Sequence, residues 1–184
     1  MDTSDGRSER LLVHAAVERH GAPESLLIGG LGVGYSLTEA VLVESLDRIV
    51  VAEVEPVLVD WHRRFFSSRT GDALADERVE VILDDVACVL AASAATFDVV
   101  CLDTDNGPNW TVTEANRRLY TAAGLRPAVA ALRPGGVLAY WSAHPVEAFA
   151  ALLREHLSEV QRHDVPVALG RAAPDVVYVG VRPS

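Results

Sequence analysis

Residues 25–35 read SLLIGGLGVGY, and this stretch decides the fold of the chain. It opens on a short, continuous apolar run, which is typical of a buried strand in a parallel sheet. The run ends in glycines and passes into a helix that is expected over about residues 35–46. A glycine-rich turn between a buried strand and a helix lets the backbone approach a ligand closely. The stretch therefore predicts the first strand of an α/β sheet with a ligand-binding loop directly after it.

Strands and helices alternate on both sides of this stretch. Further strands are expected over residues 48–54, 78–83, 97–103, 135–142, about 159–165 and about 175–182. Further helices are expected over residues 9–20, about 56–67, 85–94, 113–132 and about 145–157, with Pro127 kinking or splitting the fourth of these. The last two strands have no helix between them, which indicates an antiparallel hairpin. The chain is thus predicted to be one α/β domain over residues 1–184, with helices on both faces of a seven-strand, mostly parallel sheet.

Length and charge exclude several classes of protein. The chain has 184 residues, with 26 acidic and 16 basic side chains and a formal net charge of −10, and every basic residue is arginine. A hydrophobic content of 49% suits a globular domain rather than a disordered chain. So acidic a chain is a poor binder of phosphate backbones, and no nucleic-acid partner is expected. No apolar run approaches the roughly 18 residues that span a bilayer, so no membrane partner is expected either.

The N-terminus and the cysteines predict the compartment. Residues 1–10, MDTSDGRSER, are polar and of mixed charge, which does not fit a signal peptide, and residues 1–8 are expected to be disordered. Cys88 and Cys101 each lie in an apolar run and are interpreted as buried free thiols, which fits a reducing environment. The protein is therefore expected in the cytoplasm.

The spacing of the loop glycines distinguishes two kinds of nucleotide site. The dinucleotide fingerprint G-x-G-x-x-G, counted from Gly30, requires glycine at position 35, where this chain has Tyr35. A nicotinamide-dependent oxidoreductase is therefore disfavoured. Gly30, Gly32 and Gly34 instead follow the tighter G-x-G-x-G spacing of the nucleoside loop in S-adenosylmethionine-type enzymes.

Acidic residues follow the next two predicted strands, at the edge where open parallel sheets bind ligands. Glu53 lies 19 positions after Gly34, where a carboxylate accepts hydrogen bonds from a ribose diol, and Glu55 takes this role if the strand ends later. Asp84 and Asp85 follow the third strand. One of them could accept a hydrogen bond from an adenine amino group while the other caps the next helix, and Asp85 is the preferred binder.

The fourth strand leads into DTDNGPNW, residues 103–110. Asp103 and Asp105 are two positions apart, and crowding two carboxylates at a strand mouth is costly unless a cation lies between them. Trp110 is interpreted as a substrate-contacting side chain, and the alternative is an ordinary turn whose tryptophan belongs to the core. After the fifth strand, His144 could line the mouth of the pocket, whereas Ser142 has no obvious base. The 6 histidines lack metal-ligand spacing, so no metal site is predicted.

Five segments, in this order, resemble the spermidine synthase-like branch of the S-adenosylmethionine-dependent transferases: LLIGGLGVGYSLTEAV, VVAEVEP, ILDDVACVLA, FDVVCLDTDNGP and LRPGGVLAYWS. The resemblance covers about residues 24–145. It implies a three-layer, Rossmann-like class I methyltransferase fold.

The resemblance also implies a role for each matched residue. The three loop glycines would cradle the donor, Glu53 would bind its ribose and Asp85 its adenine. Asp103 would be catalytic, since the matching acid of aminopropyltransferases helps to hold and deprotonate the attacking amine. Asp105 and Trp110 are substrate-binding candidates from their position alone.

Two departures from the family pattern bear on the acceptor. Spermidine synthases carry a small N-terminal β domain over the pocket, whereas the 24 residues before the first strand here read as helix, and no such domain is expected. The motif around Asp103 is shorter than the family's Asp-Ser-Ser-Asp-Pro type, so Asp105 has no matched position.

The sequence thus predicts a transferase that binds S-adenosylmethionine or its decarboxylated form. It would pass an aminopropyl or methyl group to a small acceptor, with an amine as one candidate. The alternative is a non-catalytic nucleoside-binding or interaction protein that kept the fold. A homodimer is compatible with either.

Overall fold

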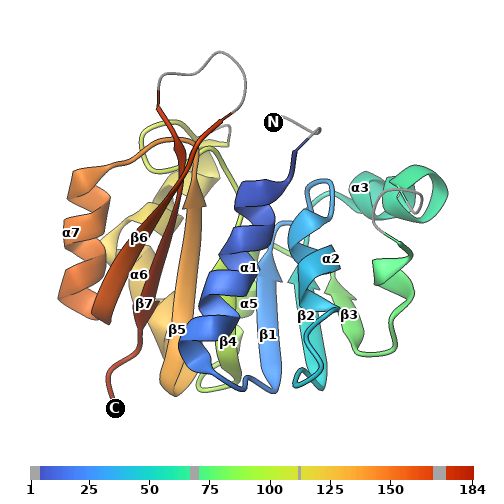
Figure 1. Ribbon diagram of the computed structural model, residues 1–184, viewed down its shortest axis with the longest axis horizontal. Coiled ribbons are helices and arrows are strands. Elements are labelled where there is room, and N and C mark those ends of the chain that lie inside the picture. The colour runs from blue at the N-terminus through green and yellow to red at the C-terminus, as the bar shows by residue number, and fades with distance from the viewer. Residues whose placement is uncertain (1–4, 67–70, 112, 168–172) are drawn as a thin grey trace.

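The computed structural model describes residues 5–66, 71–111, 113–167 and 173–184, and its elements form three layers (Figure 1). The middle layer is a sheet of β1 (Ser25–Gly29), β2 (Arg48–Ala52), β3 (Val79–Ile82), β4 (Phe97–Leu102), β5 (Leu132–Ser142), β6 (Ser158–Val165) and β7 (Asp175–Val181). One face carries α1 (Arg7–His20), α2 (Tyr35–Ala40) and α3 (Pro56–Trp61), and the other carries α5 (Val86–Ala92), α6 (Ala122–Ala131) and α7 (Glu147–His156). Short π or 3₁₀ segments are η1 (His62–Phe66), η2 (Ala73–Ala75) and η3 (Glu114–Tyr120).

The seven strands form one sheet, as predicted, and their order in it is β3-β2-β1-β4-β5-β7-β6. Strands β1 to β5 run parallel, and β7 is antiparallel to both β5 and β6. The closing hairpin predicted from the missing helix is therefore confirmed. Strand β1 pairs with β2 on one side and with β4 on the other. The first three strands therefore extend the sheet in one direction from β1, and the later strands extend it in the opposite direction.

Burial on both faces explains the uninterrupted apolar run of β1. All five of its residues are buried. Leu26 and Ile28 pack in the cluster under α1 and α2, and Leu27 packs in the opposite cluster under α5 and α6. A strand covered on both faces has no solvent side, so polar alternation is absent from its sequence.

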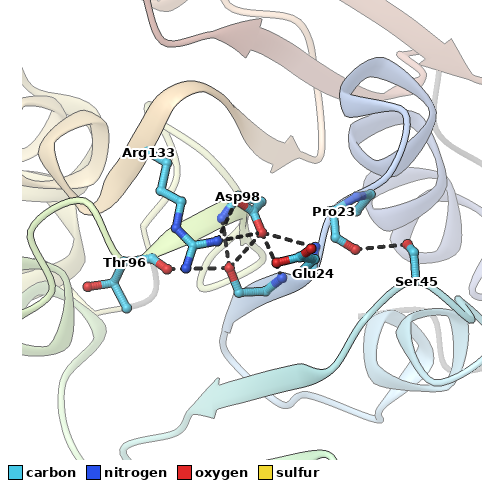
Figure 2. Close-up of polar contacts among 7 residues, drawn as sticks. Pro23, Glu24, Ser45, Thr96, Asp98 and Arg133 are labelled. Carbon is cyan, nitrogen blue, oxygen red and sulfur yellow. Dashed lines mark hydrogen bonds and ion pairs between the residues drawn. The ribbon is translucent and has the colours of Figure 1, made fainter.

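A buried carboxylate ties together the strand starts at the sheet edge opposite the glycine loop (Figure 2). Asp98 is 6% exposed, and its Oδ2 accepts the Glu24 N–H at 3.0 Å, the Ser25 N–H at 2.9 Å and the Ser25 hydroxyl at 2.8 Å. The Arg133 guanidinium donates to both Asp98 oxygens, at 2.9 and 3.1 Å. Burial alone would raise the pKa of Asp98, but the hydrogen bonds from Ser25, Glu24 and Arg133 outweigh it and hold the pKa below its usual value.

Helix α2 ends earlier than the apolar pattern predicts, at Ala40 rather than near residue 46. The Arg78 guanidinium, 35 or so positions along the chain, donates to the carbonyl oxygens of Val41, Val43 and Leu46 at 2.6 to 3.1 Å. These carbonyls are therefore satisfied without continuing the helix.

The helix expected over residues 113–132 is split, but not at the proline. The break falls at Thr121, whose hydroxyl oxygen accepts the Gly124 N–H at 3.3 Å and caps α6, while Pro127 lies inside α6. Helix α1 starts at Arg7, so Arg7 and Ser8 are ordered, contrary to the prediction for residues 1–8, of which residues 1–4 lie outside the described part.

The prediction for the two thiols is half correct. Cys101 is buried in β4, whereas the prediction that Cys88 is buried is wrong, because it lies on the solvent side of α5. Among the described residues, no helix is long and apolar enough to cross a membrane.

Candidate active site

The candidate site lies at the carboxyl edge of the parallel strands, where β1 and β4 diverge. Open α/β sheets bind their ligands at such a switch point. The two strand ends are in direct contact, because the Asp103 N–H donates to the Gly29 carbonyl oxygen at 2.9 Å. The topology therefore brings the glycine loop and Asp103 together, as the sequence predicts.

The loop needs glycine for two separate reasons. Gly30, Gly32 and Gly34 all have positive φ, at 91°, 49° and 89°, a region that side chains rarely adopt. A Cβ on Gly30 would also lie 2.5 Å from the Asp103 carbonyl oxygen. The loop thus passes directly against the end of β4. Its predicted contact with a donor stays a prediction.

Glu53 is buried beneath this loop rather than exposed at its rim. It is 5% exposed, and its two oxygens accept the Leu31 N–H and the Glu55 N–H, each at 2.8 Å. An ionised carboxylate offers about four lone-pair sites, so ribose hydroxyls can still donate to it. The alternative, Glu55, is exposed at the N-terminus of α3, so Glu53 is the better placed of the two. Its ribose contact stays a prediction.

The cap of α5 is Asp85, the residue preferred as the adenine binder, and not Asp84. Asp85 is the N-cap of α5, with its Oδ1 accepting the Ala87 N–H at 2.9 Å, and its Oδ2 pairs with the Arg118 guanidinium. Asp84 is exposed, and its carboxylate accepts the Asp85 N–H at 2.7 Å. Asp cannot be assigned to cap or ligand from its type alone, because it suits both.

Two exposed aliphatic side chains flank this acidic edge. Val54 is 64% exposed directly after Glu53, and Leu83 is 56% exposed directly before Asp84. They follow neighbouring strands, since β2 pairs with β3. Two exposed apolar groups at adjacent strand mouths suit the faces of a flat ring. Neither residue is marked by its sequence, because an apolar residue at the end of a strand is typical of the core.

Asp103 lies in an acidic environment. Burial, followed by the negative charges of Glu9 and Asp175, raises the pKa of its carboxyl group to about 7, against a hydrogen bond from the Ser36 hydroxyl that lowers it. Its neighbours come from three other elements: α1, α2 and β7. Like charges gathered in this way favour either a shared proton or a bound cation.

Helix α1 supplies residues to the site that sequence analysis missed. Ser8, in its first turn, lies 3.0 Å from Asp175 Oδ2 and 2.8 Å from Glu9 Oε2, measured from its hydroxyl oxygen. The first turn of α1 therefore holds Glu9 and Asp175 beside each other. The order of the elements could have predicted this position. A helix that precedes β1 and runs antiparallel to it begins at the edge of the sheet where β1 ends.

The predicted substrate-binding residues differ in their surroundings. Asp105 is 8% exposed, and its oxygens accept the N–H groups of Asn106, Thr113 and the Asn116 amide at 2.8 to 3.3 Å. These contacts hold the loop together, and a contact of Asp105 with a substrate stays a prediction. Trp110 is 56% exposed, so it does not belong to the core. Its contact with a substrate stays a prediction.

The end of β5 supports this loop. Ser142 is fully buried and donates to the His144 carbonyl oxygen at 2.8 Å, and the Ala143 N–H donates to the Asn106 carbonyl oxygen at 3.0 Å. Ser142 therefore has a packing role here. Within the described ranges, no group of three or more metal-ligating side chains could hold an ion.

Comparison with known proteins identifies the family of the chain. The model of the spermine/spermidine synthase domain matches residues 7–167. Polyamine aminopropyltransferase of Aeropyrum pernix is 31% identical over 160 residues, 83% of this chain and 48% of that protein. Putrescine N-methyltransferase 1 of Nicotiana tabacum is 31% identical over 131 residues, 70% of this chain and 33% of that protein. The chain thus spans about half the length of these relatives or less.

A solved structure shares the fold. A spermidine synthase in complex with the transition state analogue AdoDATO superposes with a TM-score of 0.85 at 17% identity, over 96% of this chain and 61% of that one. The switch-point site and the reversed last strand thus define a Rossmann-like fold of the class I methyltransferase type. Within that class, the chain belongs to the spermine/spermidine synthase family.

Proposed function

We propose that this protein binds an adenosyl sulfonium donor, S-adenosylmethionine or its decarboxylated form, and transfers an aminopropyl or methyl group to a small amine. The observation that carries the proposal is the placement of Asp103. It lies against the glycine loop at the switch point, with Glu9 and Asp175 beside it. Family membership supports the same reading, since relatives include both an aminopropyltransferase and a methyltransferase.

The adenosine part of the donor fits the edge formed by β2 and β3. Glu53 would accept hydrogen bonds from the ribose hydroxyls, and the adenine ring would lie between Val54 and Leu83. The exposed Asp84, rather than the capping Asp85, would accept the adenine amino group. Contact of the ring with these two exposed aliphatic side chains would remove apolar surface from water.

The acceptor would enter the acidic side of the site. An amine arrives as an ammonium ion, which Glu9, Asp103 and Asp175 attract. Asp103 then takes a proton, and a pKa of about 7 suits proton transfer near neutral pH. The freed amine nitrogen attacks the carbon bonded to the sulfonium, the C–S bond breaks and its electrons return to sulfur. Most of the acceleration would come from holding the two reactants in line.

Calorimetric titration and product analysis test the proposal together. The protein is titrated with methylthioadenosine and with S-adenosylhomocysteine, and then incubated with each donor and a panel of diamines for mass spectrometry. Binding plus an alkylated amine supports the transferase. Binding without any product supports the non-catalytic alternative, and no binding of either nucleoside rejects the proposal.

A further inference from the structure

A buried histidine contacts the glycine loop from outside the predicted site. His62, the first residue of η1, is 4% exposed, and its Nε2 lies 3.0 Å from the Gly32 carbonyl oxygen. A carbonyl oxygen only accepts, so Nε2 carries the proton in this contact. The ring is held in place by Phe66, whose ring packs edge-on at 5.0 Å between centroids.

This contact fixes the direction of one peptide group. The Gly32 carbonyl and the Val33 N–H belong to the same planar unit, and the described chain has no cis peptide bond. In a trans peptide the C=O and N–H bonds point in opposite directions. Because His62 holds the carbonyl on one side, the Val33 N–H points to the other side, away from η1. Gly32 has positive φ, so this peptide would turn easily without such a hold.

The other N–H groups at the start of the loop are already occupied. The Gly30 N–H donates to the Ala52 carbonyl oxygen, the Leu31 N–H to Glu53 and the Gly34 N–H to the Leu31 carbonyl oxygen. In the part of the loop from Gly30 to Gly34, which the structure describes fully, Gly32 and Val33 are the residues whose N–H groups have no hydrogen-bond partner. These two are the donors that a ligand can still use.

We infer that His62 is a positioning residue that aims the Val33 N–H at the carboxylate of the donor's amino-acid tail. The inference rests on the proposed function. The negative charges of Glu9 and Asp175 act on Asp103 at this edge and repel a carboxylate, so we assign the carboxylate to the unoccupied N–H groups of the loop itself. His62 would therefore matter for a donor that carries the carboxylate and not for its decarboxylated form.

The test compares two ligands that differ only in this carboxylate, S-adenosylhomocysteine and decarboxylated S-adenosylhomocysteine. Affinities are measured by calorimetry for the unmodified chain, His62→Gln and His62→Asn. The glutamine amide reaches about as far as Nε2 of histidine, whereas the asparagine amide is too short. His62→Asn should weaken the carboxylated ligand about five- to tenfold and the decarboxylated ligand less than twofold, and His62→Gln should restore most of the loss.

Val59→Ala is the control for packing damage. It creates a cavity in the neighbouring helix, so it should lower Tm but weaken both ligands by the same factor. If His62→Asn does not fold, His62→Phe makes the same comparison, because its ring fills the space and lacks the donor. Equal losses for both ligands, or no loss for either, overturn the inference. If the unmodified chain binds neither ligand, the proposed function fails and the inference fails with it. Binding of the decarboxylated ligand alone by the unmodified chain overturns the inference but leaves the proposed function standing.

Discussion

Asp103 is the residue whose chemistry can be separated from binding. Asn has the shape of Asp but accepts no proton, so Asp103→Asn should lower turnover about 100- to 10,000-fold while methylthioadenosine affinity changes less than about threefold. Steady-state kinetics and calorimetry on the same preparation measure the two effects. Full activity of the variant on an identified amine would remove Asp103 from the catalytic role.

Glu9 should tune Asp103 through its charge. Burial, Glu9 and Asp175 together raise the pKa of Asp103 to about 7, and the base is active only when deprotonated. Activity should therefore fall as pH drops through about 7. Glu9→Gln removes a like charge, so the acid limb of kcat/KM should move down by about half a pH unit.

The matched control is Glu18→Gln, at the exposed end of the same helix, which changes the net charge equally. Its pH profile should overlay that of the unmodified chain. A profile that moves equally in both variants would point to overall charge and not to Glu9.

Glu53 should matter for every adenosine ligand. Glu53→Ala leaves the Leu31 N–H and the ribose hydroxyls without an acceptor, which should cost about 1–3 kcal/mol of binding. Methylthioadenosine and S-adenosylhomocysteine should weaken alike in calorimetry, whereas Glu55→Ala should change neither. Unchanged affinities in Glu53→Ala would exclude this residue from the site.

Residue types predicted part of this site and could not predict the rest. The loop glycines, Glu53 and Asp103 follow strands directly, so the strand pattern alone places them at one edge. Glu9 and Asp175 reach the same edge from α1 and β7, and no local motif marks them. Which of Asp84 and Asp85 caps α5 depends on the residue at which the helix begins. The sequence does not define this start to within one residue.

At the scale of elements, Asp98 links the starts of β1, β4 and β5 through hydrogen bonds to Ser25 and Arg133. Asp98→Asn weakens its pairing with Arg133 and presents an amide to backbone N–H groups, so the free energy of unfolding should fall by about 2–4 kcal/mol. Denaturant unfolding measures the change. Asp164→Asn, in an exposed pair with Arg162, is the control and should cost less than about 0.5 kcal/mol.

The same carboxylate predicts a dependence on pH. Its pKa is below the usual value in the folded protein, so its contribution is complete above the unfolded pKa of about 4 and is lost as pH falls through the folded pKa. The stability gap between the unmodified chain and Asp98→Asn should therefore narrow on acidification. A constant gap would mean that the lost stability reflects packing alone.

Element types were predictable where local pattern and tertiary contacts agree, and element ends were not. Strand β1 reads as buried because it is buried on both faces. The end of α2 is set by Arg78, a residue far along the chain, which offers the carbonyls of Val41 and Leu46 another donor. Pro127 lies inside α6 without ending it, although proline lacks the N–H that would donate to the Ala123 carbonyl oxygen.

At the scale of the whole molecule, the distribution of charge should decide between donors. The chain carries a net charge of −10 and no lysine. Glu9, Asp103 and Asp175 gather at the switch point, whereas Arg118 is paired with Asp85 and the Arg10 guanidinium lies over the Tyr35 ring. Such a site favours an ammonium over a carboxylate, so decarboxylated S-adenosylmethionine should bind more tightly than the intact form.

The N–H groups of Gly32 and Val33 can bind the carboxylate of the intact donor, which reduces the preference for the decarboxylated donor. The ratio of the two dissociation constants should therefore be about threefold to thirtyfold. Side-by-side titrations should show the gap narrowing in Asp103→Asn, because one negative charge is gone. High salt should narrow it as well, because salt screens the part of the attraction that acts through solvent. If the difference in affinity between the two donors stays the same in Asp103→Asn and at high salt, it comes from the shape of the site and not from its charge. Equal or tighter binding of the intact donor would favour methyl transfer, because the loop N–H groups would then outweigh the acidic cluster.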